Sequence, residues 1–184
     1  VATAQQESPV GRTRTLPSGA APNVKLAVSS CANYPFGYFN VYQRIAERDD
    51  LNAVIHLGDY LYEYAPGTYD GGSVAGRRHF PEREIVSLSD YRLRHAQYKR
   101  DPDLQAAHQQ HPWICVWDDH ESTNNSWHGG AENHNPGEGD WQIRKEIAIQ
   151  AYHEWMPIRE QRNDTAGLHI YRRFQLFEVI GIIF

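Results

Sequence analysis

The residues with the clearest chemical potential lie in the segment Gly-Asp-Tyr-Leu-Tyr-Glu at positions 58–63. This segment directly follows the apolar run 53–57, which is typical of a strand that is covered on both faces. A strand that ends in Gly-Asp, with a tyrosine three residues beyond the aspartate, presents a carboxylate and a phenol at its carboxyl end. Asp59 and Tyr62 would therefore lie where open α/β sheets bind ligands, and their oxygens suit a hard ion such as ferric iron. The alternative is a Gly-Asp turn in which Tyr62 packs as an ordinary aromatic side chain.

Two other strand-like runs end in residues that bind metals or transfer protons. Cys31 follows the run 24–29, and Asp119 and His120 follow the run 112–117. Because parallel strands present their carboxyl ends at one edge of a sheet, we expect these side chains to lie near Asp59. A carboxylate can hold a divalent cation while the adjacent histidine protonates or stabilises a leaving oxygen. The sequence therefore predicts a metal site at this edge.

Each of these assignments has an alternative. Cys31 is as readily explained as a buried thiol. The acidic segment 118–121 could instead cap the N-terminus of a helix, and for Asp118 we favour that interpretation. Glu121 could bind a metal or could orient His120 from behind.

Two polar loops could complete the site. Asn124 and Asn125 could supply amide oxygens to a hard cation such as calcium, although polar loop residues are common without that role. Arg78, with its neighbours Arg77 and His79, could place positive charge against a phosphate. A solvated basic turn explains these three residues equally well.

The segments between these residues alternate between strand and helix patterns, which predicts an α/β fold. Strands are expected at 24–29, 53–57, 112–117 and 168–174, and helices at about 38–48, from Ser89 or Asp90 onward, at 102–110 and around 143–155. The order strand, helix, strand implies a right-handed parallel crossover. Helical stripes from Tyr38 to Ile45 and from Ile143 to Trp155 are predicted to be core faces. Segments 64–84 and 122–139 are expected to be long loops.

The two ends of the chain differ in composition. Residues 1–23 are rich in Ala, Gly, Pro, Ser, Thr and Gln, and we expect a tail or linker there. Residues 11–15 could be the last strand of a preceding domain. Residues 24–184 are predicted to form the α/β domain.

Composition excludes several classes of protein. A net charge of −5 argues against nucleic-acid binding through a basic patch. No run approaches the roughly 18 apolar residues of a membrane span, and no basic and apolar leader follows Val1. Two cysteines do not make a disulfide framework, and Cys115 is expected to be a small core residue. A nucleotide-binding module is disfavoured because Gly-rich phosphate loops are lacking.

Four motifs carry a resemblance to a known family. They are Ser-Cys at 30–31 with Gly-Tyr-Phe-Asn at 37–40, His-Leu-Gly-Asp-Tyr-Leu-Tyr-Glu at 56–63, Asp-Tyr-Arg at 90–92, and Trp-Asp-Asp-His-Glu at 117–121. In this order they resemble the alkaline phosphatase D (PhoD-like) family of phosphodiesterases. Their Gly-Asp-x-x-Tyr core is also similar to that of purple acid phosphatases. The resemblance covers roughly residues 11–174.

The resemblance implies a calcineurin-like metallophosphatase fold, an αββα sandwich of which this chain would hold the first half. It also implies ferric iron and calcium ions in an enzyme that releases phosphate from mono- and diesters. By matching positions, Cys31 and Tyr62 would bind iron and Asp59 would bridge the metals. Asp119 occupies a slot where many metallophosphatases have Asn, and His120 would lie near the leaving group. The implied reaction is attack of a metal-bound hydroxide on phosphorus.

Family members continue well beyond the point where this sequence stops, and their later loops supply further ligands. We therefore expect low or absent activity in the isolated chain, because ligand number and charge set metal affinity. The alternative is a non-enzymatic metal-binding fragment or pseudo-enzyme. A secreted or periplasmic location is implied by the resemblance alone.

Overall fold

The structure is a computed structural model, and it describes residues 7–15, 23–69, 74–158, 170–176 and 180–183. At its centre is a parallel sheet in the order β1-β2-β3, made of β1 (Leu26–Ser29), β2 (Ala53–His56) and β3 (Trp113–Cys115). Helix α1 (Asn40–Ala46) connects β1 to β2, which confirms the predicted parallel strand-helix-strand unit. All three strand ends that carry candidate ligands therefore meet at one edge.

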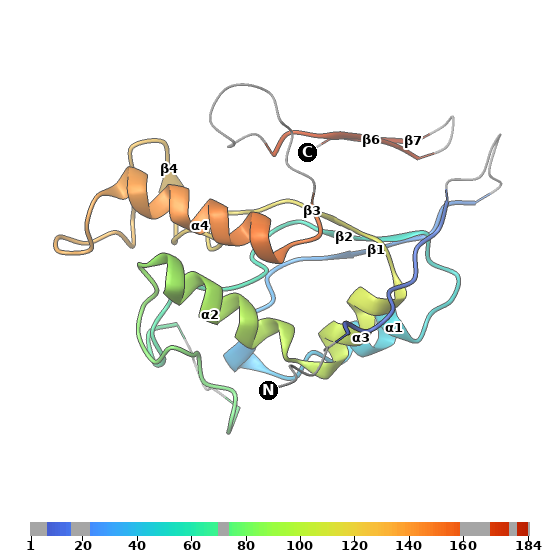
Figure 1. Ribbon diagram of the computed structural model, residues 1–184, viewed down its shortest axis with the longest axis horizontal. Coiled ribbons are helices and arrows are strands. Elements are labelled where there is room, and N and C mark those ends of the chain that lie inside the picture. Colours follow the sequence, from blue (N-terminus) through green and yellow to red (C-terminus); the bar gives the residue numbers. More distant parts are fainter. Residues whose placement is uncertain (1–6, 16–22, 70–73, 159–169, 177–179, 184) are drawn as a thin grey trace, which may run out of the picture.

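Helices cover one face of this sheet (Figure 1). They are α1, α2 (Leu88–Lys99) and α3 (Pro102–Gln110), and α4 (Trp141–Trp155) packs along α2. Val54 and Trp113 point from the strands into the main core, where they join side chains from all four helices. Alternate residues of each strand thus bury one side of the sheet beneath the helices.

The other face of the sheet carries a second, smaller core. Ala53, Ile55 and Ile114 pack there with Leu26 and with Phe174. Phe174 belongs to β6 (Arg173–Leu176), which pairs antiparallel with β7 (Ile180–Ile183) in a hairpin that lies across the sheet in Figure 1. Helices on one face and strands on the other agree with the predicted partial αββα sandwich, and the α/β class is confirmed.

Several predicted boundaries need correction. The 38–48 helix is shorter than expected, because a 3-10 turn (Tyr34–Phe36) precedes it and α1 begins only at Asn40. Helix α2 is capped by Ser87, whose hydroxyl accepts a hydrogen bond from the Asp90 amide, rather than by Ser89 or Asp90.

The predicted loops and the last strand also differ from expectation. The 122–139 loop contains a short hairpin of β4 (Ser126–Trp127) and β5 (Gly130–Ala131). The strand expected at 168–174 starts at Arg173, and residues 168–169 lie outside the described residues. In the 11–15 segment no regular structure forms, and the Arg12 amide donates to the Gln109 carbonyl at 2.7 Å. Its assignment to a preceding domain stays a prediction.

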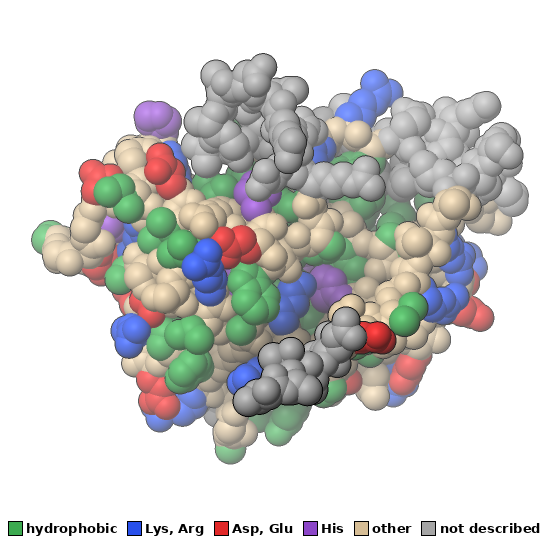
Figure 2. Space-filling model, viewed as in Figure 1, with side chains coloured by type: hydrophobic (Ala, Val, Ile, Leu, Met, Phe, Trp, Pro, Cys, Tyr) green, Lys and Arg blue, Asp and Glu red, His purple; other side chains and the backbone are tan. Residues whose placement is uncertain are grey.

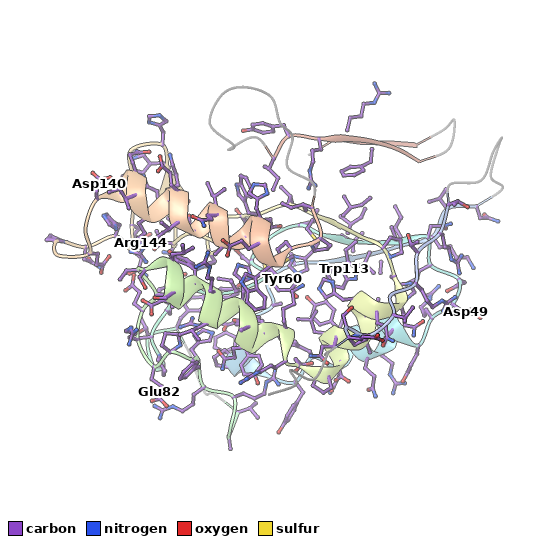
Figure 3. All side chains as sticks on the ribbon, viewed as in Figure 1. Asp49, Tyr60, Glu82, Trp113, Asp140 and Arg144 are labelled. Atoms are coloured by element: carbon purple, nitrogen blue, oxygen red, sulfur yellow. The ribbon has the colours of Figure 1, made fainter. Side chains whose placement is uncertain are left out.

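The two predicted core stripes are only partly correct. Tyr38 is 64% exposed and Ile143 is 60% exposed, so neither belongs to the core. The buried face of α4 instead consists of Trp141, Arg144, Ala148, Ala151 and Tyr152. The stripe is misplaced because Arg144 is buried through its ion pairs with Glu84 and Glu138, which an apolar pattern cannot reveal. Figure 3 shows Arg144 between α4 and α2.

The surface carries mixed charge. In the view of Figure 2, Lys and Arg side chains alternate with Asp and Glu. None of the helices in the described part of the chain has the length and apolar character needed to cross a membrane.

Neighbouring arginines on the 74–84 segment allow a matched stability test. Arg77 is buried, pairs with Asp101 at 2.8 Å and lies 3.7 Å above the Tyr34 ring, whereas Arg78 is exposed and lies 3.5 Å from Glu82. We expect Arg77→Ala to lower the free energy of unfolding by about 3 kcal/mol, because it leaves the Asp101 carboxylate buried and unpaired. Arg78→Ala should change it by less than about 1 kcal/mol. Urea unfolding followed by circular dichroism measures both, and equal losses would contradict this account.

Candidate metal centre

The centre is built on a sharp reversal of the backbone after β2. Gly58 and Asp59 both have positive φ, at 104° and 52°, and Cys31 after β1 has a φ of 58°. The Cys31 amide donates to the Gly58 carbonyl at 3.2 Å, and the Ala32 amide to the Asp59 carbonyl at 2.8 Å. Left-handed residues other than Gly are uncommon and cluster at functional sites. The two loops are thus fastened together where their side chains can share a ligand.

Gly58 is required for a second reason, which is contact with the segment after β3. A Cβ at this position would lie 2.4 Å from the Asp118 amide nitrogen and 2.9 Å from the Trp117 carbonyl carbon. The glycine therefore permits both the close approach and the sharp turn.

Glu121 holds these two segments in register. Its carboxylate accepts hydrogen bonds from the backbone amides of Asp59 at 3.0 Å, Tyr60 at 2.5 Å and Asp118 at 2.8 Å. Burial raises the pKa of Glu121 to about 8, and the three amides oppose that shift. Both oxygens of Glu121 are engaged by backbone amides, and its possible roles as a metal ligand or in orienting His120 stay predictions. It is a positioning residue for the Asp59 turn.

Asp59 is the point at which the donors meet. Its Oδ2 accepts a hydrogen bond from the Cys31 thiol at 3.3 Å and from the Tyr62 hydroxyl at 3.3 Å. Its Oδ1 is buried and has no hydrogen-bond partner among the described residues. Ligand atoms of Asp59, Asp119 and His120 all lie within 4.8 Å of one another. A buried carboxylate oxygen without a partner, beside further O, N and S donors, fits a metal ion.

The protons on these donors are firmly held. Burial, together with the charge of Asp59, raises the pKa of Tyr62 far above its ordinary value. The Ser30 hydroxyl lowers the pKa of the Cys31 thiol, but burial and Asp59 outweigh it and raise that pKa overall. Burial also raises the pKa of Asp59, against the opposing effect of His120. Thiol and phenol are thus hydrogen-bond donors here, and a cation would have to displace their protons.

His120 is oriented by a carboxylate that the sequence analysis did not assign. Glu63 is completely buried, and its Oε2 accepts a hydrogen bond from His120 Nδ1 at 2.8 Å. Its Oε1 accepts from the Asn124 amide at 2.7 Å and from Asn133 Nδ2 at 2.9 Å. Nδ1 is thereby engaged, so Nε2 is the nitrogen available to a cation or a leaving oxygen. The sequence did contain a signal for this role, because Glu63 is the last residue of the Gly-Asp-Tyr-Leu-Tyr-Glu motif at 58–63.

Glu63 and His120 shift each other's pKa through their hydrogen bond and their charges. Burial alone would raise the pKa of Glu63, but the hydrogen bond and charge of His120 lower it overall. Burial alone would lower the pKa of His120, and Glu63 raises it overall. Folding therefore favours a carboxylate beside an imidazolium.

The other predicted site residues are less closely associated. Residues 118–121 do not begin a helix but enter a turn, so the helix-cap interpretation is wrong, including for Asp118, where we favoured it. Asn124 Nδ2 lies 3.4 Å from Glu132 Oε2, and its role as a metal ligand stays a prediction. Arg78 is exposed on the surface beside Glu82, which favours the solvated turn, and its role in substrate binding also stays a prediction.

A buried network supports the loop that follows His120. The Tyr91 hydroxyl donates to the Ser122 carbonyl, and Arg144 Nε donates to the Tyr91 hydroxyl at 3.2 Å. Arg144 also donates to the Asn133 carbonyl at 3.1 Å. The tyrosine of the Asp-Tyr-Arg motif thus links α2 and α4 to the loop that carries the site.

Gly58 and Gly76 both have positive φ, but only at Gly58 would an added Cβ collide with other atoms. Comparing their alanine variants therefore separates the cost of the collision from the cost of backbone strain. We expect Gly58→Ala to destabilise the chain by about 2 kcal/mol or more, because the new Cβ meets backbone atoms as well as an unfavourable φ. Gly76 has a φ of 81° with open space around it, so Gly76→Ala should cost only about 1 kcal/mol. Urea unfolding midpoints compare the two variants. A Gly58→Ala variant as stable as Gly76→Ala would show that the close approach of Gly58 to residues 117–118 is not needed for stability.

The Glu63–His120 pair gives a pH signature in the metal-free chain. Glu63→Gln should lower the pKa of His120, measured by NMR titration, and exposed Glu132→Gln should leave it unchanged. The stability that His120 contributes is lost as pH rises through its raised pKa, and that of Glu63 is lost as pH falls through its lowered pKa. The stability gap between wild type and Glu63→Gln should therefore be largest between these two values. A gap that does not vary with pH would show that the pair is not ionised.

Comparison with known proteins identifies the family of this chain. Residues 26–183 match the family model described as PhoD-like phosphatase. The chain is 41% identical over 175 residues to alkaline phosphatase D of Bacillus subtilis (strain 168), covering 94% of this chain and 30% of that protein. It also superposes on a solved structure of PhoD with a TM-score of 0.83 at 40% identity, covering 96% of this chain and 34% of the other. The chain thus spans about a third of the length of the relatives it matches, and it belongs to the PhoD-like phosphatase family.

Proposed function

We propose that this chain carries part of the catalytic site of a metal-dependent phosphoric ester hydrolase of the alkaline phosphatase or phosphodiesterase type. The observation that supports it most directly is the convergence on Asp59, whose carboxylate faces Cys31 and Tyr62 and lies within 4.8 Å of donors on Asp119 and His120. The relative from Bacillus subtilis is named an alkaline phosphatase. A small phosphate ester is the substrate class that follows.

Ferric iron and calcium are the proposed cofactors. Cys31, Tyr62 and Asp59 would hold the iron, since thiolate, phenolate and carboxylate together offset its charge. Asp59 and Asp119 would hold calcium through oxygen, with Asn124 as a further candidate. When bound, these cations would supply Lewis-acid chemistry for displacement at phosphorus.

His120 is the proposed catalytic residue. Glu63 fixes its Nδ1 and raises its pKa, so Nε2 carries a proton over a wider pH range than in a free histidine. As the bond between phosphorus and the leaving oxygen breaks, that oxygen would take the Nε2 proton. Glu63 would then stabilise the orientation of the ring without touching the ester.

We expect weak turnover from the chain by itself. The donors described above come from one side of the site, and metal affinity depends on ligand number and charge. A secreted or periplasmic location is proposed from the family resemblance.

Neighbouring aspartates provide the test of this function. The chain is loaded with iron and calcium, dialysed and submitted to elemental analysis, as wild type, Asp119→Ala and Asp118→Ala. Asp119→Ala should weaken metal binding at least about tenfold, because it removes a ligand, whereas exposed Asp118 has no assigned ligand role. Asp59→Ala should abolish binding of both ions.

Hydrolysis of bis(p-nitrophenyl) phosphate by the same samples separates the two candidate functions. Slow release of p-nitrophenolate that disappears in His120→Ala but not in Asp118→Ala supports the hydrolase. Metal binding with no release in any sample supports the non-enzymatic metal-binding alternative. Metal binding retained in both Asp59→Ala and Asp119→Ala would refute the proposed centre.

A further inference from the structure

An open groove lies beside the candidate metal centre. It encloses about 310 Å³ next to Cys31, and its walls include Phe36, Tyr38, Phe39 and Val41. This volume is at the lower end of the range for small-molecule sites, roughly 300–1,000 Å³. Because Cys31 lines the groove and also contacts Asp59 Oδ2, the groove and the candidate centre are adjacent.

A row of aromatic rings joins the groove to His120. The Phe36 and Tyr69 rings stack with centroids 5.9 Å apart, and Tyr69 stacks on Tyr62 at the same separation. The Tyr62 ring lies 4.2 Å from the His120 ring. These ring contacts connect the groove to the centre; Tyr62 and His120 are buried, so the accessible part of the row is Phe36 and Tyr69.

The aromatic and aliphatic wall of the groove is accessible, and Ser29, Ser30 and Asn33 form a polar part of the lining. Phe36 is 49% exposed, Tyr38 is 64% exposed and Val41 is 65% exposed. Among the described residues that line it, none carries a formal charge apart from the ionisable Cys31 and the tyrosines. The Arg77 guanidinium packs against the Tyr38 and Phe39 rings, 5.4 and 4.9 Å from their centroids, and the exposed rings can cover a flat, uncharged group.

We propose that this groove is a subsite for an uncharged aromatic group esterified to the phosphate. The inference rests on the proposed function, because it places the phosphate at the Asp59 centre and the ring against Phe36 and Tyr38. Among phosphate esters, the site should therefore bind those with aryl or similarly flat substituents more tightly than those with small alkyl substituents.

Two phosphonates, which cannot be hydrolysed, test the subsite without depending on turnover. Phenylphosphonate and methylphosphonate share the charged group and differ only in the substituent. Their dissociation constants are measured by calorimetry on the chain loaded with iron and calcium. Wild type should bind phenylphosphonate more tightly. Phe36→Ala and Tyr38→Ala should each reduce that preference roughly three- to tenfold, with methylphosphonate binding unchanged.

The control is Tyr171→Ala, which removes an aromatic side chain that is 74% exposed and lies outside the groove lining. It should preserve the preference for phenylphosphonate. Equal affinity of wild type for the two ligands, or an unchanged preference in both groove variants, would overturn the subsite while leaving the proposed function intact. Failure of both phosphonates to bind the metal-loaded chain would overturn the proposed function and the subsite together.

Discussion

The carboxylate of Glu121 is the interaction on which the rest of the site depends. Three backbone amides, from the turn after β2 and the segment after β3, converge on this one buried side chain. They hold Asp59 in a left-handed conformation that its side chain would not otherwise favour. Gly58 lets the two segments approach closely enough for these bonds to form. The backbone at Asp59 is therefore held by Glu121, and its carboxylate accepts hydrogen bonds from Cys31 and Tyr62.

Glu63 and Glu121 position different parts of the site around Asp59. Glu121 fixes the backbone, and Glu63 fixes the imidazole of His120 and the loop that follows it. Both carboxylates are buried, so each must be fully hydrogen-bonded to offset the cost of its desolvation. Buried and hydrogen-bonded carboxyl groups of this kind are typical of sites where geometry must be held closely. It also explains why Tyr91 and Arg144, which touch none of the candidate ligands, are buried together beneath the same loop.

The sequence was informative where a residue's role follows from its position at a strand end. Cys31, Asp59, Tyr62, Asp119 and His120 come together because parallel strands present their carboxyl ends at one edge, and that topology follows from the strand and helix pattern. The roles of Glu63 and Glu121 could not be predicted, because spacing alone does not reveal which carboxylate turns toward the backbone. Arg144 was missed because hydrophobic periodicity treats a buried charge as surface. The hairpin of β4 and β5 has strands too short to produce a pattern.

The arrangement around Asp59 ties metal binding to proton release. One carboxylate oxygen accepts hydrogen bonds from both a thiol and a phenol; burial raises the pKa of the buried Tyr62 phenol, and the pKa of the exposed Cys31 thiol is also raised. A cation that enters must supply enough charge to replace both protons, which a trivalent ion does better than a divalent one. In the absence of such an ion the same hydrogen bonds keep Cys31 and Tyr62 directed at Asp59. The protonated donors are therefore already brought together at Asp59 before the proposed cation binds.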